Sequence, residues 1–68
     1  MGPGLHEAKA RLAYPDELGK LASSMASRWP LVIVVGPKGY RGVEEGVGVV
    51  VVERDKAPYG VVALKRVV

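Results

Sequence analysis

The chain of 68 residues contains no cysteine, and histidine occurs once, at His6. No disulfide can form, and the cysteine and histidine ligands of common zinc sites are missing, so we expect no metal. A domain of this size buries only roughly 60% of the surface that its unfolded chain exposes, which leaves a marginal core. Small folds are usually reinforced by disulfides, metals or association. We therefore predict a homo-oligomer, most simply a dimer.

Asparagine, glutamine, threonine and phenylalanine are absent as well. Loss of thermolabile amides and thiols, combined with abundant charge, is typical of proteins from hyperthermophiles, and we predict a thermophilic source. A genome rich in G and C would favour the same valine, glycine, alanine, arginine and proline codons, so that explanation stays open.

Long apolar runs are also missing. The longest, Leu31 to Val35, falls far short of the ~20 residues that a membrane-spanning helix needs. The first residues, Met1 to Gly4, lack the basic region and the apolar core of a signal peptide. We expect a cytoplasmic protein without membrane contact, organised as one small domain over residues 1–68 with a flexible segment at 1–4.

Valine, by contrast, is abundant: it accounts for thirteen of the 68 residues, most of them in the segments 47–52 and 61–68. Successive side chains of a strand point to opposite faces, and both segments are apolar at successive positions. Between them, the segment 57–60, Ala-Pro-Tyr-Gly, places proline and glycine where a type I turn accepts them. This pattern predicts a β-hairpin whose strands are apolar on both faces.

The first half of the chain predicts a strand followed by a helix. Residues 5–14 alternate apolar and charged side chains, as a half-buried strand does, although the segment also fits a helical stripe. We prefer the strand. Residues 16–28 carry apolar side chains at helical spacing, with Asp16 as the expected N-cap and Pro30 as the stop.

The remaining segments complete a predicted α+β domain. The run 31–35 predicts a buried strand, and the glycine-rich segment 36–46 predicts a loop. The element order is β-α-β-β-β, or α-α-β-β-β if residues 5–14 are helical. Either order predicts one helix packed on a three- to four-stranded, mostly antiparallel sheet.

One helix can cover only one face of such a sheet, and contiguous exposed apolar surface normally marks an interface. We expect dimers that form face to face or edge to edge, or docking on a partner protein. The alternative is that the twist of the sheet and the long loop cover the second face within one chain. The candidate interface residues are Val50, Val52, Val62 and Leu64.

The loop over 36–46 is the best candidate for binding chemistry. Its glycines let backbone N–H groups approach a phosphate closely, and Lys38, Tyr40 and Arg41 could grip a nucleic-acid backbone and stack a base. The net charge of +3 mildly favours RNA or DNA as a partner. Two further cations, Arg54 and Lys56, extend the candidate set. A flexible, solvated loop is the alternative.

Candidate catalytic groups do not converge in the sequence. His6 lies near the start of the chain, and the three serines of the helical segment have no base placed to activate them. We expect neither enzymatic activity nor a cofactor. The sequence predicts a small dimeric binding module that contacts nucleic acid through the glycine-rich loop. The alternative is an accessory or structural subunit that docks on a larger protein complex through its valine-rich sheet.

Overall fold

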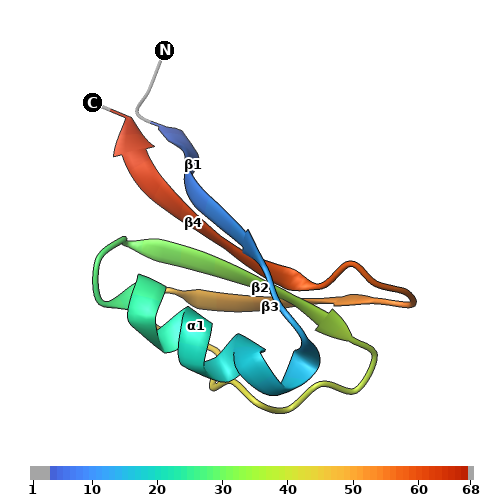
Figure 1. Cartoon of the computed structure of the whole chain (residues 1–68). Coiled ribbons are helices and arrows are strands. Elements are labelled where there is room, and N and C mark those ends of the chain that lie inside the picture. Colours follow the sequence, from blue (N-terminus) through green and yellow to red (C-terminus); the bar gives the residue numbers. More distant parts are fainter. Residues whose placement is uncertain (1–3, 68) are drawn as a thin grey trace.

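The chain forms four strands and a helix in the computed structural model of Figure 1, which describes residues 4–67. The α+β class and the order β-α-β-β-β are confirmed, and the strand interpretation of the first segment is correct. The elements are β1 (Gly4–Leu12), the 3-10 helix η1 (Pro15–Glu17), α1 (Leu18–Ala26), β2 (Leu31–Pro37), β3 (Val49–Arg54) and β4 (Gly60–Val67).

Two sequence expectations fall at the ends of the chain. The segment 1–4 was expected to be flexible, but its last residue, Gly4, begins β1. Residues 1–3 lie outside the described residues, as does Val68, which the sequence places in the last strand.

The sheet is mixed, with the strand order β1-β4-β2-β3. β4 pairs antiparallel with both β1 and β2, whereas β3 pairs parallel with β2. Two of the three pairings are therefore antiparallel, as predicted. Because β4 lies between β1 and β2, those two strands run in the same direction, and the chain passes from one to the other through α1 (Figure 1).

The structure differs from the predicted hairpin of the two valine segments. β3 and β4 follow one another in sequence but do not pair, because β2 lies between them. The connection 55–59 must pass the end of β2 and span about 10 Å, two strand spacings, where a type I turn spans one. It contains a cis Ala57–Pro58 peptide instead. An isolated antiparallel bridge joins Gly46 and Val49 across the turn that precedes β3.

The helix begins differently from the sequence prediction. Asp16 is not the N-cap: Pro15 already starts the 3-10 turn, since proline is suited to the first helical position, and Tyr14 precedes it. The backbone N–H of Tyr14 donates to Oε1 of Glu17 at 3.1 Å. The apolar face is placed as predicted, with Leu18 fully buried and Trp29 packed against the core.

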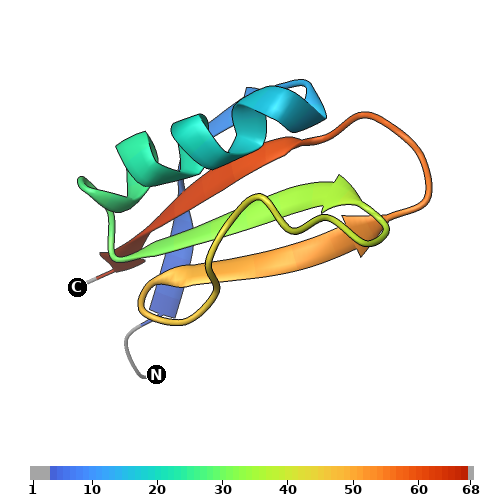
Figure 2. The same ribbon diagram turned by 90° about the horizontal axis from the view of Figure 1, so that it is seen from below.

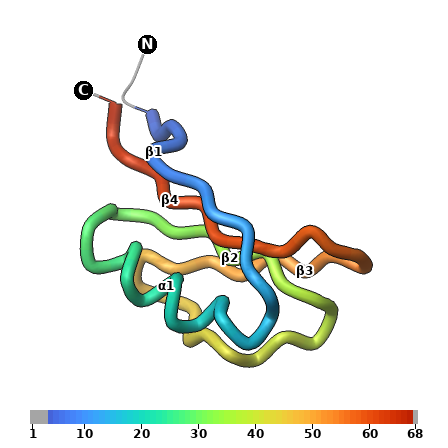
Figure 3. The backbone as a smooth tube through the Cα atoms, viewed as in Figure 1, coloured from blue at the N-terminus to red at the C-terminus, as the bar shows by residue number. Residues whose placement is uncertain are grey.

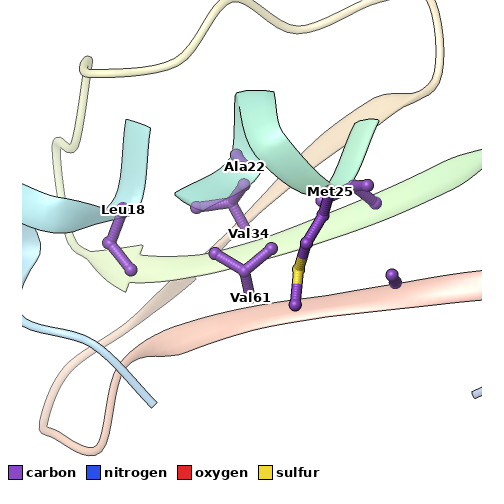
Figure 4. Packing of buried hydrophobic residues seen from close by; sticks show 7 residues of the cluster. Leu18, Ala22, Met25, Val34 and Val61 are labelled. Atoms are coloured by element: carbon purple, nitrogen blue, oxygen red, sulfur yellow. The ribbon is translucent and has the colours of Figure 1, made fainter. Parts of the chain in front are cut away.

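The core lies between α1 and one face of the sheet (Figure 4). In β2, burial alternates strictly along the strand, so that every second side chain points at the helix. Burial of these aliphatic side chains is the main stabilising term of so small a domain. The core consists of Leu18, Ala22, Met25, Val32, Val34, Val61 and Ala63.

The 38–48 loop covers the same face as the helix. It returns from the end of β2 to the start of β3 across the front of both strands in Figure 2. Val43 of this loop packs against the core. A Cβ atom at Gly19 of α1 would lie 2.8 Å from the carbonyl oxygen of Gly42, so loop and helix are in close backbone contact. The predicted loop is therefore a packed element of the fold.

β1 and β4 project beyond the rest of the sheet as a two-stranded arm, which the backbone trace of Figure 3 shows. Residues 4–6 of β1 pair with residues 65–67 of β4, beyond the last residue of β4 that pairs with β2. The register shifts between Glu7 and Lys9, where a β-bulge strengthens the local twist.

Replacement of Val34 by alanine is expected to lower the free energy of unfolding by about 2–3 kcal/mol, because a fully buried side chain loses two methyl groups and leaves a cavity. Val47 offers a matched control, since it is fully exposed. There the same change should cost about 0.5 kcal/mol or less. Urea denaturation measures both values, and equal losses would contradict this core.

Candidate functional site

The face of the sheet turned away from α1 carries a continuous aliphatic surface, which we name the open face. The register sets its composition, because directly paired residues share a face. Ile33 of β2 pairs with Val50 on one side and with Val62 on the other. The aliphatic residues of the open face are Ala10, Leu12, Leu31, Ile33, Val35, Val50, Val52, Val62 and Leu64, and the same register places the charged residues Glu7, Arg54 and Arg66 at its ends.

All four residues predicted at an interface lie on the open face. Val50 and Val52, on the edge strand β3, are 45% and 44% exposed. Val62 and Leu64, on β4, are half-buried by their neighbours in the adjacent strands. Neither α1 nor the 38–48 loop covers this surface, since both pack on the opposite face. The structure therefore brings the four residues together, and their role in an interface stays a prediction.

Tyr40 of the glycine-rich loop is packed into the fold. A Cβ atom at Gly36 would lie 3.0 Å from Cγ of Tyr40, and the ring also touches Gly42. Tyr40 packs against the hydrophobic core and is half-buried. The glycines thus make room for an aromatic ring, and most of that ring is not free to stack on a base.

Three of the four cations predicted to bind nucleic acid, Lys38, Arg54 and Lys56, lie near one end of the sheet, where β2 and β3 both end. Nζ of Lys38 lies 2.9 Å from Oδ1 of Asp55, in an ion pair exposed to solvent. Nη1 of Arg54 donates to the carbonyl oxygen of Pro58 at 3.3 Å on the open-face side. Lys56 is exposed in the connection that follows.

Arg41 lies on the other side of the sheet from Arg54. It lines a polar hollow with Glu45 and Glu53, next to Val51, whose side chain faces the helix side. Glu53 also accepts a hydrogen bond from the backbone N–H of Gly39 at 2.6 Å. Carboxylates are therefore interleaved with the cations, and the structure does not gather the five predicted residues on one surface.

Within residues 4–67, no group of three histidine, cysteine, aspartate or glutamate side chains is placed to hold a metal ion. No helix in that range is long and apolar enough to cross a membrane.

Comparisons with models of known protein families, with curated proteins and with solved structures found no match to this chain.

Sequence reasoning missed the exposed side chains at the end of β1. Leu12 and Tyr14 were assigned to one face of a half-buried strand, yet each is 77% exposed. Leu12 pairs with Gly60, which has no side chain to pack beside it. The signal that could have indicated this exposure is Pro15. It begins η1, so the strand already ends at Leu12 and Tyr14 lies beyond it.

Replacement of Tyr40 by alanine is expected to lower the free energy of unfolding by about 2 kcal/mol, because a packed ring is removed from above Gly36. Arg41 is exposed, and Arg41→Ala should change stability by about 0.5 kcal/mol or less. Thermal and urea unfolding of both variants test this. A Tyr40→Ala variant as stable as the unmodified chain would show that the ring is not a packing residue.

Proposed function

We propose that this chain is a small non-enzymatic binding module that self-associates through its open face. The observation that carries the proposal is the one-sided cover of the sheet, since α1 and the 38–48 loop pack on the same face. The other face is aliphatic where all four strands pair, with Glu7, Arg54 and Arg66 only at its ends, and removing the aliphatic side chains from water is favourable. A second copy offers the same surface, as a two-fold symmetric interface requires.

The size of the open face favours a weak dimer. The part shared by all four strands is four residues long. From strand spacing and rise per residue it is about 19 Å wide and about 13 Å long, which gives a footprint of roughly 250 Å². Standard interfaces bury about 800 Å² on each partner. The arm of β1 and β4 enlarges the surface only modestly. We therefore expect a reversible dimer with micromolar affinity.

The edges of the sheet are less suited to pairing than the open face. β1 carries a bulge between Glu7 and Lys9 and several charged side chains, which are features that block strand addition. On β3, the carbonyl oxygen of Val49 already accepts a hydrogen bond from the N–H of Gly46 at 3.1 Å. These features support association face to face over association edge to edge.

Replacement of Val62 by lysine is expected to weaken self-association about 100-fold or more, since a charge would be brought into the centre of an apolar contact. Val50→Lys, on the edge strand, should weaken it less. Val47→Lys is the matched control, because Val47 is fully exposed and lies off the open face. Sedimentation equilibrium measures the dissociation constants, and circular dichroism checks folding.

Two outcomes of that experiment would contradict the proposal. One is a chain that stays monomeric at protein concentrations up to ~500 µM, which would leave the open face for a different protein. The other is a dimer that all three variants leave intact, which would place the interface elsewhere.

Contact with nucleic acid is the second candidate function. It is favoured by the position of Lys38, Arg54 and Lys56 near one end of the sheet, all with exposed side chains. The ion pair between Lys38 and Asp55 and the packing of Tyr40 weaken this case. We therefore rank it below self-association.

The second candidate makes a prediction of its own. Binding of labelled single-stranded RNA, followed by fluorescence anisotropy at ~50 and ~200 mM salt, should weaken steeply with salt. Lys38→Ala and Lys56→Ala should each lower the salt slope by ~1, because each removes one phosphate contact. Glu44→Ala is the control and should leave the slope unchanged. Absence of binding at the lower salt concentration would exclude this function.

A further inference from the structure

We infer that the groove between residues 12–15 and 57–59 binds an extended, proline-rich peptide that carries a carboxylate at one end. The groove lies at the end of the sheet and is formed by the last residues of β1 and by the connection from β3 to β4. Its main part lies beyond the end of the sheet, whereas the hollow over Gly60 overlaps the open face at Val35 and Val62. A dimer formed through the open face would cover that hollow, so a second copy and the peptide would compete there.

The groove is elongated and apolar. Its main part has a volume of about 390 Å³. A second hollow of about 210 Å³ continues it over Gly60. Leu12, Pro58 and Tyr59 line both hollows, which therefore adjoin each other, and we name the pair the groove. No charged residue is among the described residues that line the main part, which comprise Leu12, Ala13, Tyr14, Pro15, Ala57, Pro58 and Tyr59.

The walls of the groove expose large apolar side chains. Leu12 and Tyr14 are each 77% exposed. A chain this small has few large side chains, and these two do not contribute to its core. A ligand that covered these two side chains would remove their apolar surface from water, which is favourable. A tyrosine ring gives a ligand a rigid apolar surface together with a hydroxyl donor, at little cost in conformational entropy.

The backbone of the walls excludes recognition by strand addition. Pro15 and Pro58 have no N–H group. The N–H of Ala13 donates to the carbonyl oxygen of Tyr59 at 3.0 Å, and that of Tyr14 donates to a carboxylate of η1 at 3.1 Å. A ligand strand would find too few partners for a ladder of hydrogen bonds. A polyproline II segment needs no such ladder, because it is extended in isolation and has no internal hydrogen bonds.

Aromatic and proline side chains are the surfaces on which polyproline II segments dock. Proline rings of the ligand would pack on Tyr14, Tyr59 and Leu12. The hydroxyl groups of the two tyrosines can donate to the ligand carbonyl oxygens, which have no other partner. The groove therefore matches such a peptide in shape, in polarity and in hydrogen-bonding capacity.

The charge at the far end of the groove fixes the second feature of the ligand. Arg54 lines the hollow over Gly60, and its Nη1 donates to the carbonyl oxygen of Pro58 at 3.3 Å. This hydrogen bond holds the guanidinium beside the groove, and the other N–H donors of the group remain for an anion. No carboxylate is among the described residues that line the hollow. An acidic residue or a terminal carboxylate of the ligand would pair there.

The test uses acetylated hexaproline ending in glutamate as the probe, titrated into the isotope-labelled chain and followed by nuclear magnetic resonance. The amide signals of Leu12, Ala13, Tyr14, Ala57 and Tyr59 are expected to shift, with a dissociation constant below ~1 mM. A peptide of alternating glycine and serine ending in glutamate is the matched control ligand. It should bind about 10-fold more weakly or not at all, since it lacks both the rings and the preformed conformation.

Variants separate the two parts of the recognition. Leu12→Ala and Tyr14→Ala should each weaken binding about 10-fold, while Leu5→Ala, which changes an exposed leucine at the other end of β1, should not. Arg54→Gln should remove the preference for the glutamate-ended peptide over its amide-ended form, and Arg41→Gln should keep it. Leu12 and Tyr14, the two exposed positions in the groove, lie outside the hydrophobic core, so both can be replaced without disturbing it.

Three results would overturn the inference. They are absence of shifts at ~1 mM probe, equal binding of the glycine–serine peptide, and binding that both Leu12→Ala and Tyr14→Ala leave unchanged. Loss of the charge preference in Arg41→Gln rather than Arg54→Gln would overturn the assignment of the carboxylate site. Self-association is measured separately, by sedimentation of the chain without peptide, so failure of either proposal can be told from failure of the other.

Discussion

The amount of chain available to cover the sheet is the constraint on which the rest of the structure depends. Four strands at a spacing of about 4.8 Å make a sheet about 19 Å wide, and one helix, about 10 Å in diameter, covers half of it. The 38–48 loop covers the β3 side of the same face, where Val43 and Val49 line one hollow and both pack against the core. After this, the described chain has no segment left to cover the open face, which stays in contact with water.

Close contact between the loop and the helix depends on small residues. Gly19 lets the backbone of the loop approach α1, and Gly36 makes room for the ring of Tyr40. Two of the glycines in the predicted phosphate-binding loop, Gly36 and Gly42, therefore act in packing. The same loop closes the parallel connection from β2 to β3, a type of crossover that usually needs a helix or a dozen residues or more. Packing of this loop explains how so short a chain forms a parallel pair.

The two proposed binding surfaces differ in their physical basis. The open face is broad and aliphatic. It belongs to the same strands whose opposite side packs against α1, so these strands are apolar on both faces. The groove at the end of the sheet is narrow and uncharged along its main part, with tyrosine, proline and leucine walls and Arg54 at one end. A broad aliphatic face favours a second broad face, whereas a narrow groove with exposed rings favours an extended segment.

The sequence by itself determined the local elements and the apolar character of both sheet faces. Alternation before Pro15, helical spacing from Leu18 to Met25 and β-branched runs are local signals, and each produced the predicted element. Tertiary structure alone decided which strands pair. The two valine segments were expected to form a hairpin, but β2 lies between them and pairs with both. Its residues are as apolar as those of the valine segments. Which strands pair therefore depends on long-range packing, which no local pattern encodes. The same packing decided that Tyr40 is half-buried and that Leu12 and Tyr14 are exposed.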